Sequence, residues 1–368
     1  MDRRKFVTAT GLAGAAGLLT ACSPQGTGGS DPAAAGAAYG KTFEWKMVTT
    51  WPRDFPGLGT GANRLVESIG RLSNGRLKIK VYGGNELVPP FEVFDAVQQG
   101  TAEMGHGASY YWKGKIPATQ IFSGVPFGLT GHELNGWYYH GGGLELYQQA
   151  YQAHGVVPFP VGNSGVQMGG WFNKEIHSLA DLAGLKMRIP GLGGEVLKRA
   201  GGTPVNVPGS ELFTALQSGT IDAAEWIGPF NDLAFGLFRA AKYYYYPGWQ
   251  EPGTGLECSI NAKAWAALPP DLQEIIAVAC KASVTDMYAE FEALNGQALQ
   301  TLVNEHHVQL RAFPDDVLAE LKHHTLEVLD QLAAEDEWTG KAYASFKAYL
   351  EQVRGWTEIG ERYILNHR

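Results

Sequence analysis

Two hydrophobic patterns alternate along the first third of the chain. Residues 43–51 (FEWKMVTTW) and 77–83 (LKIKVYG) have the composition of β-strands, whereas residues 60–73 and 91–100 repeat apolar positions at helical spacing. Gly100 closes the second helical segment, at the place where a glycine commonly ends a helix. Strands that alternate with helices predict an α/β fold with a mostly parallel sheet and flanking helices.

The pattern changes to long helices in the last third of the chain. After Pro269 and Pro270, apolar residues recur at helical spacing as far as about Asn304. A short strand is predicted at 308–314 (VQLRAFP), and the remainder is helical in pattern. A helix of this length beside a two-lobed core either bridges the lobes or forms a dimer contact, and the pattern leaves both open.

One short segment occurs twice. Residues 96–103 (AVQQGTAE) and 215–222 (ALQSGTID) both have the pattern of a helix end, a glycine and a strand start. Their separation is far too long for a solenoid repeat. The recurrence instead suggests two lobes of similar α/β construction, each of which approaches a central cleft with the same unit.

The N-terminus has the features of an export signal. Two arginines and a lysine at positions 3–5 precede an uncharged, weakly apolar stretch over 6–21, which is too short to span a bilayer. The paired arginines favour the twin-arginine route. The sequence LTAC resembles a lipoprotein processing box that would leave Cys22 lipidated, although ordinary cleavage is the alternative. Residues 23–40 are rich in Gly, Ala, Ser and Pro and are typical of a flexible tether.

Composition limits the partners of the exported chain. The formal charge of the whole chain, −8, argues against nucleic acid. It does not exclude an anionic ligand, because one arginine or a bound metal can set the field inside a cleft. No later segment is apolar enough to span a membrane, so the expected membrane attachment is the N-terminal lipid alone. Cys258 and Cys280 could pair after export, but two separate buried thiols are expected.

Three charged residues are the candidates for chemistry. Arg188 ends a predicted strand at a Pro-Gly turn, where an α/β lobe presents side chains to a ligand, and a guanidinium can grip a carboxylate through two parallel hydrogen bonds. Glu225 and Glu251 lie among apolar and aromatic residues, so each needs a cation, a donor or a proton. Ordinary salt bridges are one alternative. An acid/base pair of an exported hydrolase or lyase is another, but the chain has no G-x-S-x-G or H-E-x-x-H motif.

Four segments together resemble a known family. GNSGVQMGGWF, LADLAGLKMRIPG, ELFTALQSGTIDAAEWIGPFND and YYYYPGWQEP, in this order, resemble the solute-binding proteins of tripartite ATP-independent periplasmic (TRAP) transporters, in particular the branch that binds 2-oxo acids such as pyruvate. The resemblance covers roughly residues 41 to 350. It implies an α/β, two-lobed periplasmic-binding-protein-like (Venus flytrap) fold with a long bridging helix.

The resemblance also implies how the chain is divided. Residues 1–22 are the export signal with its lipoprotein box, and residues 23–40 are the tether. Lobe 1 comes mainly from 41–162 and lobe 2 mainly from 163–253. Residues 254–368 supply return strands, the bridging helix and C-terminal helices shared between the lobes or with a second subunit of a homodimer.

The resemblance assigns the site residues. Arg188 matches the carboxylate-binding arginine of the family. The cation-holding positions match Gln167, Glu225, the Trp226 backbone carbonyl and Glu251, and those near the substrate match Asn163, Tyr111, Gln167 and the Trp226 ring. Ligation by oxygen alone favours Na⁺ or Ca²⁺ over zinc. A 2-oxo or 2-hydroxy acid offers two adjacent oxygens to chelate such an ion.

The expected function is therefore that of a receptor in the periplasm, exported and lipid-anchored at Cys22. It would capture a small 2-oxo monocarboxylate with a cation and deliver it to the TRAP membrane permease, without catalysis. A 2-hydroxy acid such as lactate, or another carboxylate, is the alternative ligand. A secreted carboxylate-processing enzyme and a sensory protein that uses the same cleft are the rival functions.

Overall fold

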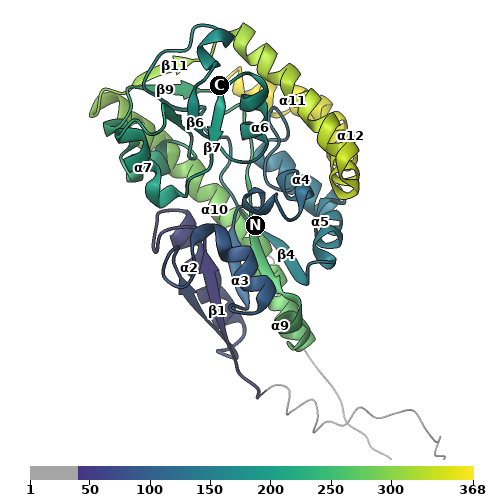
Figure 1. Ribbon diagram of the computed structural model, residues 1–368. Helices are drawn as coiled ribbons and strands as arrows, with labels where there is room; N and C mark the ends of the chain where they lie inside the picture. Colours follow the sequence, from purple (N-terminus) through teal and green to yellow (C-terminus); the bar gives the residue numbers. More distant parts are fainter. Residues whose placement is uncertain (1–39) are drawn as a thin grey trace, which may run out of the picture. The chain divides into compact units, whose positions relative to one another are not determined.

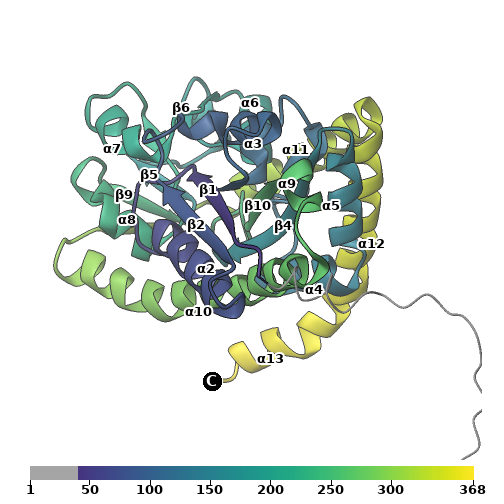
Figure 2. The same ribbon diagram turned by 90° about the horizontal axis from the view of Figure 1, so that it is seen from below.

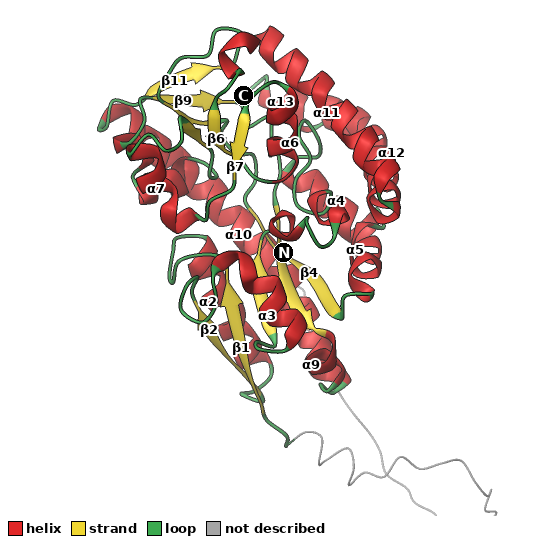
Figure 3. Cartoon of the chain, in the orientation of Figure 1, coloured by secondary structure: helices red, strands yellow, loops and turns green. Residues whose placement is uncertain are grey.

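Two β-sheets organise the part of the chain that the computed structural model describes, residues 40–368 (Figure 1). The predicted export signal over 1–22, the lipidation site Cys22 and the tether as far as residue 39 lie outside the described residues. Figure 3 shows the strands of each sheet with helices packed around them.

The first sheet has the strand order β2-β1-β3-β10-β4. In that order the strands are β2 (Leu77–Tyr82), β1 (Phe43–Thr49), β3 (Met104–Gly107), β10 (Gly255–Asn261) and β4 (Val156–Asn163). Strand β1 pairs in parallel with β2 and β3, and β10 runs antiparallel between β3 and β4. Its helices are α2 (Leu58–Leu72), α3 (Val93–Gln99), α4 (Gly131–His140), α5 (Gly143–Gln152) and α9 (Ala262–Ala266), with 3₁₀ turns η1 (Pro90–Glu92), η2 (Ser109–Trp112) and η3 (Pro117–Gln120).

The second sheet has the strand order β11-β9-β5-β8-β6-β7. These strands are β11 (Gln309–Ala312), β9 (Tyr243–Tyr246), β5 (Gly170–Phe172), β8 (Ala223–Ala224), β6 (Lys186–Arg188) and β7 (Thr203–Val205). The helices that follow them are α6 (Gly191–Arg199), α7 (Gly209–Gln217) and α8 (Pro229–Phe235), with 3₁₀ turns η4 (Leu179–Leu182) and η5 (Leu237–Arg239).

The two sheets are mixed, whereas the sequence pattern predicted a mostly parallel sheet. Four of the strand pairs in the described residues are antiparallel, and each involves β5 or β10. Both strands follow a passage of the chain from one sheet to the other, as does β11, which nevertheless pairs in parallel with β9. A strand that enters a sheet from outside is not bound to the direction set by a local crossover helix, and its hydrophobic pattern does not record that direction.

The repeated segment forms the same unit in each sheet, as predicted. Helices α3 and α7 end next to Gly100 and Gly219, whose φ angles of 77° and 73° lie in the left-handed region. The chain then enters β3 of the first sheet and β8 of the second. Glycine suits both positions because a side chain would strain this backbone conformation.

Helix α10 (Pro270–Asn304) is the long helix that the sequence predicted, and it packs against elements of both sheets. It contacts α2 and β4 of the first sheet and α8 of the second. Figure 2 shows α10 running along α2. A single helix packed on both sheets can hold them together while other connections bend. Whether α10 also forms a dimer contact stays a prediction.

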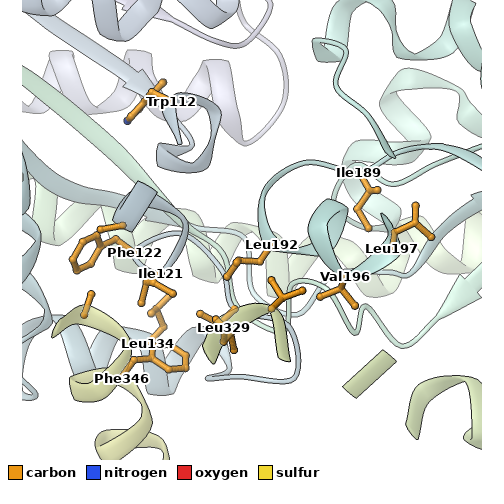
Figure 4. Packing of buried hydrophobic residues seen from close by; sticks show 14 of the residues in the cluster. Trp112, Ile121, Phe122, Leu134, Ile189, Leu192, Val196, Leu197, Leu329 and Phe346 are labelled. Atoms are coloured by element: carbon orange, nitrogen blue, oxygen red, sulfur yellow. The ribbon is translucent and has the colours of Figure 1, made fainter. Parts of the chain in front are cut away.

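Three C-terminal helices complete the described chain: α11 (Asp315–Glu335), α12 (Glu337–Ile359) and α13 (Glu361–Leu365). Helix α11 packs on α6, and α12 packs on α4 and α5, so the C-terminal helices also contact elements of both sheets. Figure 4 shows Leu329 of α11 beside Leu192 of α6, and Phe346 of α12 in the same apolar cluster near Leu134. Cys258 and Cys280 are free thiols, and both are buried.

A buried carboxylate stands in the core of the first sheet. The Glu257 side chain on β10 is fully buried and accepts hydrogen bonds from the hydroxyl groups of Tyr147 and Tyr151 on α5. The Tyr151 hydroxyl in turn accepts from the Trp112 indole nitrogen, at 2.7 Å. Burial raises the pKa of Glu257 to about 7, and the tyrosine donors only partly oppose this effect.

Glu257 makes stability depend on pH with a defined sign. Because its pKa is raised above the ordinary 4.5, its contribution to stability is complete below pH 4.5 and is lost as the pH rises through 7. Replacing Glu257 with glutamine should remove this loss, which amounts to roughly 3 kcal/mol at most. Urea unfolding at pH 5 and pH 8 measures it, and an unchanged pH dependence in the variant would contradict the prediction.

Candidate functional site

Arg188 ends β6 and lies completely inside the protein, with 1% of its surface exposed. Its Nη1 donates to the Glu225 carbonyl oxygen at 2.9 Å and to the Glu225 carboxylate. Its Nε donates to the Val207 carbonyl oxygen at 3.3 Å, and its Nη2 to the Tyr111 hydroxyl at 3.1 Å. These four bonds engage four of the five N–H groups of a guanidinium and leave one N–H on Nη2.

Glu225 and Trp226 directly follow β8 and reach Arg188 from the neighbouring strand. The Glu225 amide donates to the Arg188 carbonyl oxygen at 3.1 Å, so the backbone pairing itself sets the two side chains together. The Trp226 ring centre is 5.1 Å from the Arg188 guanidinium carbon. Within the described residues, Glu225 Oε2 and Trp226 Nε1 are buried polar atoms without a hydrogen-bond partner.

Gln167 and Glu251 form the second half of the cluster. The Gln167 side-chain nitrogen donates to Glu251 Oε2 at 2.7 Å and to Ser164 Oγ and Thr254 Oγ1 at 3.0 Å each. Thr254 donates its hydroxyl to the same Glu251 oxygen. The Gln167 side-chain nitrogen therefore has its partners. The side-chain oxygen Oε1 is buried and has no hydrogen-bond partner among the described residues.

The charges of this cluster do not balance. Burial is the main cause that raises the pKa of Glu225 well above its ordinary value, although the Arg188 charge opposes it and the Glu251 charge adds to it. Burial likewise raises the pKa of Glu251 to about 7, against the opposing hydrogen bond from Thr254. One guanidinium cannot neutralise two buried carboxylates. The cluster therefore favours a further positive charge or a proton.

The polar atoms left over fit a hard cation. Gln167 Oε1 and Glu225 Oε2 are both buried oxygen acceptors without a donor in the described chain. The described part of the chain, residues 40–368, contains no group of three or more His, Cys, Asp or Glu side chains that could hold a metal ion. An ion here would rely on amide and backbone oxygens beside two carboxylates, a donor set that suits Na⁺ or Ca²⁺ and not zinc.

The turn η2 brings two tyrosines to the cluster. Tyr111 accepts the hydrogen bond from Arg188, whereas Tyr110 bonds to Glu251 and opposes the rise of its pKa. Their ring centres are 4.9 Å apart and nearly perpendicular. Tyr110 was not among the predicted site residues. The only signal for it in the sequence is its place in the aromatic run that contains Tyr111.

Glycines make room for the aromatic side chains of the site. A Cβ atom on Gly191, whose φ is 59°, would lie 3.2 Å from the Tyr110 ring. A Cβ atom on Gly209, at the start of α7, would come within 2.5 Å of the Trp226 ring. The Trp226 ring also meets Trp51 edge to face, with centres 6.1 Å apart. Trp51, which follows β1 of the first sheet, therefore packs against an aromatic residue of the site. The sequence alone did not indicate this contact.

A cavity of about 150 Å³ adjoins this cluster. Tyr110 and Tyr111 line it on one side and Pro190 and Gly191 on another. Lys113, which follows η2, also lines the cavity and forms an ion pair of 2.6 Å with Glu195 of α6. Larger clefts, of about 490 to 610 Å³, lie against α10, away from Arg188. The smaller cavity is the relevant one because its lining includes Tyr111, the hydrogen-bond partner of Arg188.

The structure gathers all but one of the predicted side chains around Arg188. The gathered residues are Tyr111, Gln167, Glu225, Trp226 and Glu251. Asn163, at the end of β4, instead donates to the Gly131 carbonyl oxygen at 3.1 Å and to Asn135 at 3.2 Å, and accepts from the Gly165 amide at 2.9 Å. Among the described contacts, none joins Asn163 to the Arg188 cluster, so its role in the site stays a prediction.

Comparison with known proteins identifies the family. The sequence profile described as bacterial extracellular solute-binding protein, family 7 (DctP), matches residues 47–336. A monocarboxylate 2-oxoacid-binding periplasmic protein of Nostoc sp. is 40% identical over 363 residues, which is 98% of this chain and 97% of the relative. In the described part of the chain, no helix has the length and apolar character needed to cross a membrane.

Two solved structures have the same fold and bound ligands. A TRAP periplasmic solute-binding protein from Pseudoalteromonas atlantica, with bound sodium and pyruvate, is 45% identical with a TM-score of 0.86, covering 89% of this chain and 99% of that one. A second, from Colwellia psychrerythraea with bound calcium and pyruvate, is 44% identical with a TM-score of 0.87, covering 89% and 100%. Both therefore share the architecture that places Arg188 and its neighbours.

Proposed function

Because the chain belongs to family 7 of the bacterial extracellular solute-binding proteins, whose members serve transport and are not enzymes, we propose that it captures a small 2-oxo monocarboxylate such as pyruvate together with Na⁺ or Ca²⁺. The observation that carries the proposal is the pair of buried acceptors, Gln167 Oε1 and Glu225 Oε2, that have no donor in the described chain beside a buried arginine. The relatives with pyruvate and sodium or calcium support the same pair of ligands here.

The ligand carboxylate would be held by donors from two residues. We expected Arg188 to grip it with two parallel hydrogen bonds, but the Arg188 fork faces Glu225 and leaves one N–H on Nη2. Trp226 Nε1, buried and unpartnered in the described chain, supplies the second donor. Because a hydrogen bond to an ionised acceptor contributes about 1.5–3 kcal/mol, two such bonds favour a carboxylate over a neutral ligand.

The cation would be held by oxygen atoms of the chain and of the ligand. Gln167 Oε1, the carboxylates of Glu225 and Glu251, and the Trp226 backbone carbonyl are the protein ligands in this proposal. A bound cation supplies positive charge that offsets the excess of negative charge in the cluster and polarises the ligand oxygens. A 2-oxo acid contributes its carboxylate and its C2 oxygen, which lie next to each other and can chelate the ion.

The receptor would act from the outer side of the membrane. We propose that residues 1–22 direct export by the twin-arginine route, that Cys22 carries the lipid anchor and that 23–40 is the tether. Residues 41–162 and 163–253 would form the two lobes that close on the ligand. Residues 254–368 would complete both lobes and contribute to a homodimer. The loaded receptor would then dock on the TRAP permease in the membrane.

Calorimetric titration of the refolded, ligand-stripped protein tests the proposal. Pyruvate, 2-oxobutyrate, lactate and succinate would each be titrated with Na⁺, with Ca²⁺, and after chelation in sodium-free buffer. One-to-one binding of pyruvate that requires a cation is expected. A preference for lactate would support the 2-hydroxy acid alternative. Pyruvate binding of equal affinity with and without a cation would show that the site does not use one. A failure of every acid to bind would reject the ligand class.

A further inference from the structure

A buried aspartate lies behind the candidate site without facing it. Asp232 on α8 has 1% of its surface exposed. Its Oδ2 accepts from the Trp171 indole nitrogen at 2.9 Å and from the Tyr244 hydroxyl at 2.7 Å. Its Oδ1 accepts from the backbone amide of Ile227 at 3.2 Å. Among the described residues, no salt bridge involves Asp232, so neutral donors alone satisfy this carboxylate.

The Ile227 amide connects Asp232 to the candidate site. The N–H of Ile227 and the carbonyl of Trp226 belong to one peptide group, and the only cis peptide bond in the described chain is at Tyr246-Pro247. In a trans peptide the N–H and the C=O point in opposite directions. The bond from Ile227 to Asp232 therefore turns the Trp226 carbonyl away from Asp232 and fixes its direction.

The next peptide group is held as well. The Ile227 carbonyl oxygen accepts from the Met168 amide at 2.8 Å, and Met168 follows Gln167 in the chain. The segment that carries the Trp226 carbonyl is thus tied at one end to Asp232 and at the other to the connection between β4 and β5, which carries Gln167. Rotation of the Trp226 carbonyl would break the first of these bonds and disturb the second.

The same bond also changes the charge on the carbonyl oxygen. A carboxylate that accepts from a peptide N–H polarises the peptide group, so that its oxygen becomes more negative and binds a hard cation better. Groups that orient and polarise metal ligands from behind commonly change metal affinity by about 10–100-fold when they are mutated.

From this geometry we propose that Asp232 is a positioning residue for the cation: through the Ile227 amide it aims and polarises the Trp226 carbonyl. The inference rests on the proposed function, in which that carbonyl is a cation ligand. A purely structural Asp232, which only satisfied Trp171 and Tyr244 in the core, would support the stability of the fold and have no specific effect on the ion.

Two variants separate these roles. Asp232→Asn keeps the shape of the side chain but loses one acceptor oxygen and the negative charge, so it cannot satisfy all three donors. Tyr244→Phe is the matched control, because it removes one donor to Oδ2 and leaves the bond from Ile227 to Oδ1. Both variants should unfold at lower urea concentrations than the wild type. Asp232→Ser, which keeps a small acceptor, replaces the asparagine variant if that variant does not fold.

The measurements are Ca²⁺ titrations at saturating pyruvate and, in cation-free buffer, hydrogen exchange of the Ile227 amide. The asparagine variant should bind Ca²⁺ about 10–100-fold more weakly and exchange the Ile227 amide faster, whereas Tyr244→Phe should stay within about threefold of the wild type. Equal Ca²⁺ affinity in wild type and Asp232→Asn, or equal losses in both variants, would overturn the inference. If the wild-type protein bound pyruvate with the same affinity in the presence and absence of cations, the proposed function itself would be overturned.

Discussion

Replacing Arg188 with alanine is expected to reduce the affinity for pyruvate by about 30- to 5000-fold in a calorimetric titration. Truncating one partner of a buried, hydrogen-bonded charge pair costs roughly 2–5 kcal/mol, and here the ligand loses a donor while Glu225 loses its counter-charge. The protein should stay folded, because the pKa of Glu225 is already raised and the carboxyl group can take up a proton when Arg188 is absent. Circular dichroism and urea unfolding check the fold.

Two further variants define the specificity of that result. Arg188→Lys restores the charge but not the planar fork that reaches Glu225, Val207 and Tyr111 at once, so it should recover only part of the affinity. Arg64→Ala removes an arginine that pairs with Asp286 of α10 away from the site, and it should leave binding unchanged. Affinity close to that of the wild type in Arg188→Ala would remove this residue from the site.

Local patterns in the sequence were sufficient to predict most elements. The apolar spacing over 270–304 predicted one long helix, and α10 has these bounds. Gly100 closes α3 as expected, because only its left-handed conformation is needed to end that helix. Helix α6 begins at Gly191, directly after the extended residue Pro190, although the glycines of its first turn weaken the helical pattern there.

Features set by distant parts of the chain could not be predicted in this way. The antiparallel insertion of β10 depends on how the chain returns from the second sheet, and periodicity carries no information about strand direction. The contacts of Tyr110 with Glu251 and of Asp232 with the Ile227 amide likewise arise from packing between separate segments. The family resemblance named Arg188, Glu225 and Glu251 as candidates because their motifs are local, and the structure adds that Arg188 faces Glu225. Their roles in binding stay predictions.

Glu251→Gln is expected to change which ion the site prefers. With Arg188, Glu225, Glu251 and a monocarboxylate all charged, Ca²⁺ gives a neutral site and Na⁺ leaves one negative charge. In the glutamine variant Na⁺ gives the neutral site instead. Since the Coulomb energy scales with the charge of the ion, a variant that binds Na⁺ about tenfold more weakly should bind Ca²⁺ about a hundredfold more weakly. Pyruvate titrations over a range of each cation measure both losses.

Thr254→Val is the matched control for this charge effect. Thr254 donates its hydroxyl to Glu251, so the valine variant perturbs the same carboxylate without changing its charge. It should weaken the binding of Na⁺ and of Ca²⁺ by similar factors, both smaller than those expected for Glu251→Gln. If Glu251→Gln also weakened both ions by the same factor, Glu251 would act on the site through its hydrogen bonds to Gln167 and Thr254 and not as a ligand of the cation. A loss that grows with ionic charge in Glu251→Gln alone would place the Glu251 charge next to the ion.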